Sequence, residues 1–375
     1  MESKDVEYLV NNHMIPISKF RPRKILIVAR GGIGNVLMFT PTLRALKKSF
    51  PGSVISMMMS SDESRELLLN NSDVNEIITS DKETKSLFGL FKSIIELRRI
   101  HFDITIVMHP GGLRSALWAF FSGARIRIGY DMPLLRGLGV FLYTHLMKTN
   151  GELHDVEQNL NILKLLGIDN NHTPSVMTIF VSEDLKKYAR EYLTSQGFKD
   201  RDKIIGFHPG SGISQKWKRW PAPYYSELIN MIDSEWKVSV LIFGDHNEDG
   251  MISDILSGIN GSVKALKITD KTLMESAALI DLCQAFIGND SGLMHIAAAN
   301  NVPTFCIAGP TDIKKTAPYG PDSHIVYSNL ECLFCYNFNT VNFKCPQNIP
   351  YKCLNELYPK EVYKQIQPIL CQSWD

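Results

Sequence analysis

Short, unbroken apolar runs recur along the chain and alternate with amphipathic stretches. A run without polar alternation is typical of a parallel strand that helices cover on both faces. Amphipathic helix candidates lie between the runs, at residues 40–50, 222–233 and 272–283. This alternation predicts βαβ units and a doubly wound α/β fold. The expected strands are residues 24–30, 54–59 and 103–108 in the first half, and 203–210, 237–245, 284–290 and 302–310 in the second.

The same plan appears twice in 375 residues, which suits two domains of ordinary size. The polar stretch GIDNNHTPS (167–175) is the expected linker. We therefore expect two doubly wound domains that face each other across a cleft, with ligands at the carboxyl ends of the strands. The expected divisions are an extension (1–22), a first domain (23–175), a second domain (176–328), and a Cys-rich segment with a C-terminal helix (329–375).

Composition and charge exclude several classes of protein. A net charge of +1 argues against a dedicated nucleic-acid-binding protein, which carries a large basic excess. No apolar run reaches the ~18 residues of a membrane-spanning helix, and the N-terminal stretch lacks the apolar core of a signal peptide. We expect a cytoplasmic protein. The segment PLLRGLGVFLYTHLMK (133–148) is typical either of a buried helix or of one that contacts a lipid surface.

The first expected strand ends in RGGIGNVLMFTP, where Gly31, Gly32 and Gly34 allow a sharp turn and a close approach to a ligand. The spacing differs from the dinucleotide-binding G-x-G-x-x-G pattern. The loop is either a tight strand-to-helix turn or a wall of the active site. Pro41, a few residues later, is expected in the first turn of the following helix.

The loop HPGSG (208–212) follows a buried strand and offers small residues with free N–H groups, which suits phosphate oxygens. Lys216, Lys218 and Arg219 follow closely, so the loop predicts an anion site. The neighbouring strand end, LIFGDHNEDG, carries Glu248 with two aspartates. These carboxylates could accept ribose hydroxyls, or they could form a solvated acidic turn.

Another strand end carries GNDSGLMHIAAAN (288–300), with Asp290 and Ser291 in the N-cap region of a helix. His295 lies four residues after Ser291, on the same helix face. A Ser–His–Asp triad needs a His that faces the nucleophile from elsewhere, and the G-x-S-x-G pattern is absent. A helix N-terminus that holds a diphosphate is the preferred interpretation, and a plain helix cap is the alternative.

Four of the seven cysteines fall in CLFCYNFNTVNFKCPQNIPYKC. Cys332, Cys335, Cys345 and Cys353 have the spacing C-x2-C-x9-C-x7-C. Four thiolates of this kind predict a structural metal site that holds Zn or Fe. Four unrelated thiols are the alternative.

Together these motifs resemble the bacterial heptosyltransferases of glycosyltransferase family nine, over nearly the whole chain. The residues that carry the resemblance are ILIVARGGIGNVLMFTPTLRALKKSFP, FDITIVMHPGGLRSALWAFFSGARIRIGY, HDVEQNLNILKLLGI, GFHPGSG followed by KWKRWP, and GNDSGLMHIAAANNVPTFCIAGPTDIKKTAPYG. The resemblance implies a GT-B fold of two Rossmann-like domains and an inverting transfer of heptose from ADP-heptose, with no cofactor for catalysis.

The resemblance also implies roles for individual residues. The second domain would bind the donor and the first the acceptor, beside the glycines at 31, 32 and 34. Glu248 would lie on the ribose or adenine side. The implied contacts to the diphosphate and the sugar are Ser211, Gly212, Ser214, Lys218, Asp290, Ser291, Gly292 and His295.

Asn35 departs from the family pattern, because an acid usually stands there as the general base. An amide cannot take a proton from a hydroxyl at neutral pH. Three explanations are open: another group serves as the general base, the chain belongs to a subgroup with a different first-domain site, or catalysis is lost. The candidate bases are His109, Asp131 and His154, and His109 leads because it directly follows the third expected strand.

The predicted activity is heptose transfer to an acceptor hydroxyl of a lipopolysaccharide core sugar or another glycan. The cysteine segment raises a protein acceptor as an alternative, because some protein-modifying members of the family have a cysteine-ligated metal. A nucleotide-sugar epimerase and a non-catalytic nucleotide-sugar-binding protein are further alternatives. The predicted partners are an ADP-sugar and the acceptor, with a peripheral contact at the inner membrane left open.

Overall fold

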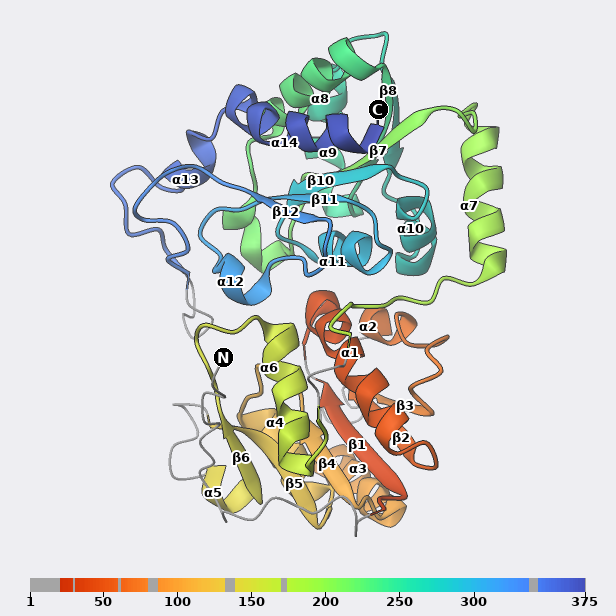
Figure 1. Cartoon of the computed structure of the whole chain (residues 1–375), viewed down its shortest axis with the longest axis vertical. Coiled ribbons are helices and arrows are strands. Elements are labelled where there is room, and N and C mark those ends of the chain that lie inside the picture. Colours follow the sequence, from red (N-terminus) through yellow and green to blue (C-terminus); the bar gives the residue numbers. More distant parts are fainter. Residues whose placement is uncertain are drawn as a thin grey trace. The chain divides into compact units, whose positions relative to one another are not determined.

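The structure is a computed structural model, and it describes residues 21–29, 31–59, 62–79, 87–131, 139–169, 174–336 and 343–374. Most of the expected N-terminal extension (1–22) lies outside these residues. The chain divides into two compact units, Met1–Phe180 and Val181–Asp375. The division falls close to the predicted 175/176 boundary (Figure 1).

The first unit contains a six-stranded sheet in the order β3-β2-β1-β4-β5-β6. Every neighbouring pair is parallel. The three strands predicted for this half are confirmed as β1, β2 and β4, and the other three were not predicted. The strands are β1 (Lys24–Ala29), β2 (Val54–Met59), β3 (Glu76–Thr79), β4 (Ile104–Val107), β5 (Ile126–Asp131) and β6 (His145–Lys148).

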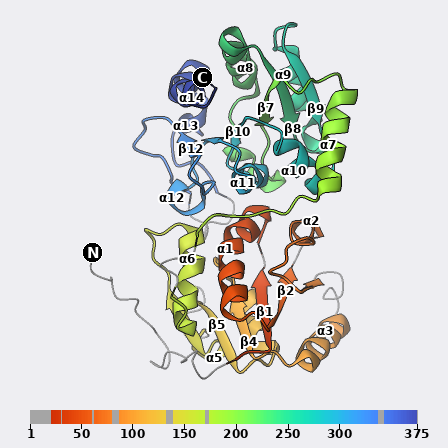
Figure 2. The same cartoon turned by 45° about the vertical axis from the view of Figure 1, so that its right-hand side comes forward.

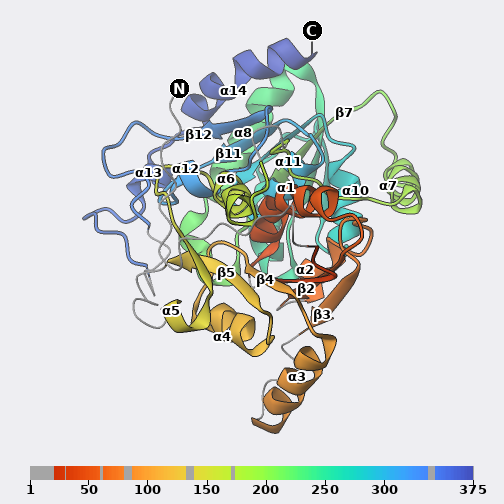
Figure 3. The same ribbon diagram turned by 60° about the horizontal axis from the view of Figure 1, so that its bottom comes forward.

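Helices cover both faces of this sheet (Figures 1 and 3). Helices α1 and α6 pack together on one face, and α4 packs between α3 and α5 on the other. The core on the second face joins apolar side chains of β1 and β4 to Trp118 and Leu97. The helices are α1 (Ile33–Ser49), α2 (Asp62–Glu66), α3 (Leu87–Ile100), α4 (Leu113–Phe121), α5 (Gly139–Leu142) and α6 (Asp155–Asn161), followed by the 3₁₀ helix η3 (Ile162–Leu166).

Pro41 lies inside α1 and not in a first turn, so the expected start of this helix was wrong. The helix begins directly after the glycine loop, at Ile33. A mid-helix proline leaves the carbonyl four residues earlier without its N–H donor. Here the Thr40 hydroxyl donates to the Leu37 carbonyl at 2.7 Å and replaces that bond. Burial of the surrounding apolar residues keeps the helix continuous through the proline.

The segment 133–148 is not one buried helix, as the sequence had favoured. Residues 132–138 lie outside the described part of the chain, 139–142 form α5, and 145–148 form the edge strand β6. The Phe141 side chain on α5 is 74% exposed. Residues 145–148, which composition alone assigned to a helix, therefore form a strand that pairs with β5.

The second unit repeats the arrangement with the strand order β12-β11-β10-β7-β8-β9, again parallel throughout. The four strands predicted here are confirmed as β7, β8, β10 and β11. Helices α8, α9 and α14 cover one face, and α10 and α11 cover the other (Figure 2). The strands are β7 (Lys203–His208), β8 (Val238–Phe243), β9 (Lys264–Ile268), β10 (Ala285–Asn289), β11 (Thr304–Ile307) and β12 (Ser323–Val326).

Several helices of this unit begin at side-chain caps. Thr272 and Glu275 form a capping box at the start of α10, and the Ser182 hydroxyl caps α7. The elements are α7 (Glu183–Ser195), η4 (Ile213–Lys218), α8 (Ala222–Trp236), η5 (His246–Glu248), α9 (Asp249–Ser257), α10 (Leu273–Ile280), α11 (Gly292–Ala299), α12 (Ile313–Thr316), α13 (Lys352–Asn355) and α14 (Pro359–Trp374).

The C-terminal segment packs into the second unit. Val362, Ile366 and Leu370 of α14 belong to the same core as β7 and α8. The buried Trp220 indole donates to the Leu357 carbonyl at 2.8 Å. The last helix therefore completes one face of the second sheet.

Both sheets have the strand order of a Rossmann fold, 3-2-1-4-5-6 when each is numbered from its own first strand. In such sheets the order reverses beside the first strand, between β1 and β4 in one unit and between β7 and β10 in the other. Ligands bind outside the carboxyl ends of the strands at this point. Among the described residues, no helix is long and apolar enough to cross a membrane.

Candidate functional site

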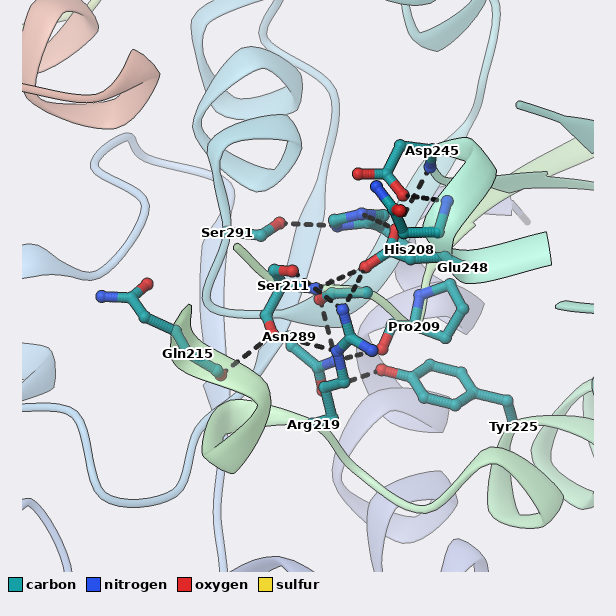
Figure 4. A network of polar contacts seen from close by, with 12 residues as sticks. His208, Pro209, Ser211, Gln215, Arg219, Tyr225, Asp245, Glu248, Asn289 and Ser291 are labelled. Carbon is teal, nitrogen blue, oxygen red and sulfur yellow. Dashed lines mark hydrogen bonds and ion pairs between the residues drawn. The ribbon is translucent and has the colours of Figure 1, made fainter. Parts of the chain in front are cut away.

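In the second unit, the loop after β7 is held by Asn289, the last residue of β10 (Figure 4). Its amide nitrogen donates to the carbonyls of Pro209 and Gly210, at 2.6 and 3.1 Å. Its amide oxygen accepts the Trp220 N–H at 3.0 Å and the Tyr225 hydroxyl at 2.9 Å. Asn289 is fully buried and all these groups are satisfied, so the loop is fixed at the point where the strand order reverses.

Glu248 supports the same loop from the side of β8. Its carboxylate is 4% exposed and accepts from Arg219 at 2.6 Å and from the Ser211 N–H at 3.0 Å. His208 Nε2 lies 3.6 Å from the other carboxylate oxygen. Burial acts to raise the pKa of Glu248, but bonds from His208, Ser211 and Arg219 outweigh it, and the pKa is lowered. Glu248 is therefore a buried anion with its charge matched locally.

Gly210 is required by this packing. A Cβ at this position would collide with the carboxylate of Glu248. The loop backbone thus lies directly on the buried anion, which the absence of a side chain permits.

Lys218 and Asp290 form a second buried pair. Lys218 Nζ lies 2.8 Å from Asp290 Oδ2, with side chains 10% and 9% exposed. His295 Nε2 lies 3.9 Å from the other oxygen of Asp290. Burial acts to raise the pKa of Asp290, but the charges of Lys218 and His295 outweigh it, and the pKa is lowered. The pair places a cation beside the N-terminus of α11.

Ser291 is the N-cap residue of α11, but its hydroxyl does not cap the helix. The hydroxyl instead lies 2.8 Å from His208 Nδ1 (Figure 4). The first N–H groups of α11 are therefore not used by this side chain. The N-terminus of a helix beside a lysine can bind an anion such as a diphosphate.

The predicted donor residues separate into two groups by burial. Gly212, at the N-cap of η4, and Ser214 are exposed, whereas Ser211 is 6% exposed. The Ser211 hydroxyl donates to the Gln215 carbonyl at 2.9 Å and accepts from Arg219. Gly292 is the first residue of α11.

Asn289 and His208 were not predicted as site residues, and Arg219 was predicted as a cation of the anion site and not as the partner of Glu248. All three lie inside the motifs at the ends of predicted strands. The available signal was their position at a strand end in a parallel sheet. The contacts that they make depend on strand order, which the sequence does not display.

In the first unit, the loop after β1 leads directly into α1, with Gly32 at the N-cap and Gly34 and Asn35 in the first turn. Asn35 folds back over the loop, because a Cβ on Gly31 would lie 2.7 Å from both Cβ and Nδ2 of Asn35. The predicted acceptor-side glycines and Asn35 therefore share one corner, at the carboxyl end of a central strand.

His109 follows β4, the other strand beside the reversal in strand order. Its side chain is 15% exposed, and Nδ1 lies 3.0 Å from Oδ1 of Asp155. The other two candidate bases lie nearby in the fold. Asp131 is the half-buried last residue of β5, and His154 is the buried N-cap of α6.

The cysteine segment lies against η4. Trp217 contacts the rings of Tyr336 and Phe343, with centroids 4.5 and 4.9 Å away. Cys332 and Cys345 are half-buried, Cys335 is exposed and Cys353 is buried. Residues 337–342, between Cys335 and Cys345, lie outside the described residues. Within the described ranges, no group of three or more His, Cys, Asp or Glu side chains is placed to hold a metal ion.

Known proteins match nearly the whole chain. A family model described as glycosyltransferase family 9 (heptosyltransferase) matches residues 90–344. Lipopolysaccharide heptosyltransferase 2 of Escherichia coli K12 is 27% identical over 313 residues, which cover 81% of this chain and 87% of that protein. Lipooligosaccharide heptosyltransferase 2 of Campylobacter jejuni serotype O:6 is 27% identical over 359 residues, covering 92% and 99%.

Solved structures share the fold. Escherichia coli ADP-heptose heptosyltransferase II has a TM-score of 0.72 and 24% identity, covering 94% of this chain and 100% of that chain. Escherichia coli heptosyltransferase WaaC, solved with ADP-2-deoxy-2-fluoro heptose, has a TM-score of 0.67 and 19% identity, covering 92% and 99%. The iron-containing dodecameric glycosyltransferase TibC has a TM-score of 0.55 and 13% identity, covering 94% and 77%. The predicted two-domain GT-B fold is confirmed.

Proposed function

The chain belongs to glycosyltransferase family 9, the heptosyltransferase family, and from this premise we propose that it transfers a heptose from ADP-heptose to an acceptor hydroxyl. It is a glycosyltransferase, and its curated relatives build lipopolysaccharide or lipooligosaccharide. We propose a core sugar of lipopolysaccharide or another glycan as the acceptor, and the cytoplasm as the compartment.

The observation that carries the proposed donor site is the buried Lys218–Asp290 pair beside the N-terminus of α11. A lysine and the N-terminus of a helix are groups that stabilise the phosphate oxygens of a diphosphate. We propose that exposed Gly212 and Ser214 contact the donor directly. Glu248 is 4% exposed and bound by the loop, so we propose that it acts on the ribose side as a positioning residue.

The proposed reaction is a single displacement with inversion. The acceptor oxygen attacks the anomeric carbon from the face opposite ADP, and the bond from that carbon to the phosphate oxygen breaks. The electron pair of this bond leaves with ADP, whose charge Lys218 and the N-terminus of α11 would offset. The acceptor proton passes to a base of the first unit. Among Asn35, His109, Asp131 and His154, we propose His109, since an amide lacks the basicity.

One experiment tests this activity. Purified protein is incubated with ADP-heptose and a lysate of bacteria that lack core heptoses, and the products are analysed by mass spectrometry. We expect release of ADP and a glycan or lipid that gains the mass of one heptosyl residue. Release of ADP with no labelled acceptor would indicate hydrolysis, and no consumption of ADP-heptose would overturn the proposed donor. A heptosylated protein would identify the alternative acceptor class.

We further propose that Cys332, Cys335, Cys345 and Cys353 bind one structural Zn or Fe ion. The support is the spacing of the four cysteines, and burial and then the three other thiols raise the pKa of Cys353 to about 12. A bound metal cation would lower the pKa of these thiols, because cysteine binds metals as the thiolate and metal uptake releases protons. The metal would brace the segment that packs on Trp217, outside the catalytic step.

Metal analysis tests this site. The wild-type protein should contain about one Zn or Fe per chain, and the variant C332S/C335S should contain none. Cys371, on α14 and outside the motif, provides the matched control, because C371S should keep the metal. A metal-free wild-type protein, or equal loss in C371S, would contradict the proposal.

A peripheral contact with an anionic membrane is also proposed, through α3 and α5 of the first unit. Phe91 and Ile95 on α3 are 67% and 49% exposed, and Phe141 on α5 is 74% exposed. Exposed Arg98 and Arg99 lie on the same helix, which suits an interface with anionic lipid. The wild-type protein should sediment with phosphatidylglycerol vesicles, and the variant F91S/F141S should not. If the wild-type protein sediments equally with phosphatidylcholine vesicles, the negative charge of the lipid does not contribute to binding.

A further inference from the structure

We infer that Asp155 positions His109 as the base on the acceptor side of the reaction. The inference rests on the proposed transfer, and it concerns a pair that the sequence analysis did not join. Asp155 is the first residue of α6, and His109 lies at the end of β4. The two residues meet because α6 begins beside the carboxyl end of the first sheet.

The contact joins a buried carboxylate to a partly exposed imidazole. His109 Nδ1 lies 3.0 Å from Asp155 Oδ1, and the side chains are 15% and 4% exposed, respectively. A carboxylate that is almost inaccessible to water gains by facing a hydrogen-bond donor. The remaining exposure of the pair belongs to His109, so the imidazole is the member that a substrate can reach.

A buried amide locks the two backbones together. Asn159 Oδ1 accepts the His109 N–H at 2.9 Å, and Asn159 Nδ2 donates to the Asp155 carbonyl at 2.8 Å. Asn159 is fully buried, so both bonds are shielded from water. One side chain of α6 therefore fixes the spacing between the histidine and the aspartate.

Tyr130 fixes the orientation of the imidazole. Its ring meets the ring of His109 edge to face, with centroids 4.9 Å apart. Its hydroxyl donates to the Gln158 carbonyl at 3.0 Å, which anchors the tyrosine on α6. Burial, and then the nearby charge of Asp155, raise the pKa of Tyr130 well above its ordinary value, so the phenol remains a donor.

This arrangement determines which nitrogen of His109 carries the proton. Nδ1 makes no hydrogen bond of full geometry to the described residues, and the Asp155 carboxylate, 3.0 Å away, is the acceptor that lies nearest to it. A carboxylate accepts hydrogen bonds and cannot donate, so Nδ1 is the nitrogen that holds the N–H in this inference. Nε2 then has the free lone pair. In the transfer, the acceptor O–H proton moves to Nε2 as its oxygen bonds to the anomeric carbon and ADP leaves with the electron pair. The imidazolium that forms lies beside Asp155, and its proton later returns to water.

The pair also accounts for the amide at residue 35. Asn35 cannot serve as a base, and its side chain lies against Gly31. His109 follows β4, the other central strand of the same sheet, so it is at the same reversal of strand order. In this inference the general base therefore lies in the loop after β4 and not in the loop after β1.

The first test is the tautomer of His109, measured by nitrogen-15 NMR of histidine-labelled full-length protein. H109Q identifies the signal of His109 among the ten histidines. The wild-type protein should show the Nδ1–H tautomer, the minor form of free histidine. D155N should shift His109 to the Nε2–H tautomer, and D155E should restore Nδ1–H. A wild-type Nε2–H signal would overturn the inference whether or not the protein transfers heptose.

The second test is kinetic, with ADP-heptose as donor and the lysate fraction as acceptor. D155N should lower kcat by about 10²–10⁴-fold, with the KM for ADP-heptose and the Kd for ADP changed less than about twofold. D131N serves as the comparison, since Asp131 is the rival carboxylate at the end of β5. A large loss in D131N with wild-type kcat in D155N would refute the role of Asp155. A wild-type protein that leaves ADP-heptose intact would refute the proposed function, while the tautomer would still decide the pairing.

Discussion

Among the proposed donor-site residues, Lys218 is the one whose removal should most reduce donor binding and turnover. In K218A, Asp290 keeps a buried charge without its partner, and the leaving diphosphate loses a cation. We expect transfer to fall about 10²–10³-fold, with weaker binding of ADP by calorimetry. Lys216 is the matched control, since it lies on the same 3₁₀ helix but is exposed. If K216A and K218A lower transfer equally, the effect comes from a general loss of positive charge, and the specific role of Lys218 is contradicted.

Glu248 should make the stability of the second unit depend on acid pH. Its pKa is lowered from the ordinary 4.5, so its ionised form stabilises the fold above pH 4.5, and this contribution is lost as pH falls through the lower folded value. E248Q leaves Arg219 without its partner and should cost about 3 kcal/mol at pH 7.

The measurement is the Tm of E248Q and of wild-type protein across pH. The difference between them should be largest above pH 4.5 and should shrink below it, because the wild-type carboxylate then becomes protonated. E227Q makes the same change on the exposed surface of α8 and should show no such trend. A difference that stays constant from neutral to acid pH would contradict the buried charge pair.

At the scale of elements, the clearest prediction concerns the proline inside α1. T40V removes the hydroxyl that donates to the Leu37 carbonyl and accepts the Thr178 N–H. The buried Leu37 carbonyl and the partly buried Thr178 N–H would each lose a partner, which should lower the free energy of unfolding in urea by about 1–3 kcal/mol.

Thr42 provides a matched control on the same helix. Thr40 and Thr42 are both fully buried, but the Thr42 hydroxyl has no hydrogen-bond partner among the residues that the structure describes. T42V should therefore be neutral or stabilising. If T40V and T42V cost the same, the shape change and not the lost bond is responsible.

The elements that the sequence did not reveal lie mostly at sheet edges. The four edge strands, β3, β6, β9 and β12, are short and partly exposed, and none was predicted. An edge strand has a partner on one side, so its sequence need not be a continuous apolar run. The seven predicted strands are interior strands with mostly buried residues. A continuous apolar run therefore indicates a strand that is buried on both faces of the sheet.

At the scale of the whole molecule, the two units have separate cores, and the proposed donor groups belong to the second unit. We expect ADP to stabilise one of two unfolding transitions. At 100 times its Kd, ADP should add about 2.7 kcal/mol, which is about 5–10 °C for a unit of this size. Calorimetry with and without ADP measures the shift.

His109→Ala, in the first unit, should leave the shift caused by ADP unchanged, whereas K218A should reduce it. A single transition that ADP shifts would mean that the units unfold as one, and an equal shift of two transitions would contradict a donor site confined to the second unit. No shift at saturating ADP would exclude the nucleotide from the second unit.

The sequence by itself determined the interior strands other than β5, the two repeats of one plan and the loops that carry polar residues at strand ends. These features follow from burial, which selects residue types locally, and the family motifs lie in the same stretches. The tertiary structure decided which side chains meet: His109 with Asp155, Glu248 with Arg219 and His208, and Asn289 with the loop after β7. Such contacts join residues far apart in the chain. They form only because strand order places β7 between β8 and β10, and because α6 begins beside the residues that follow β4.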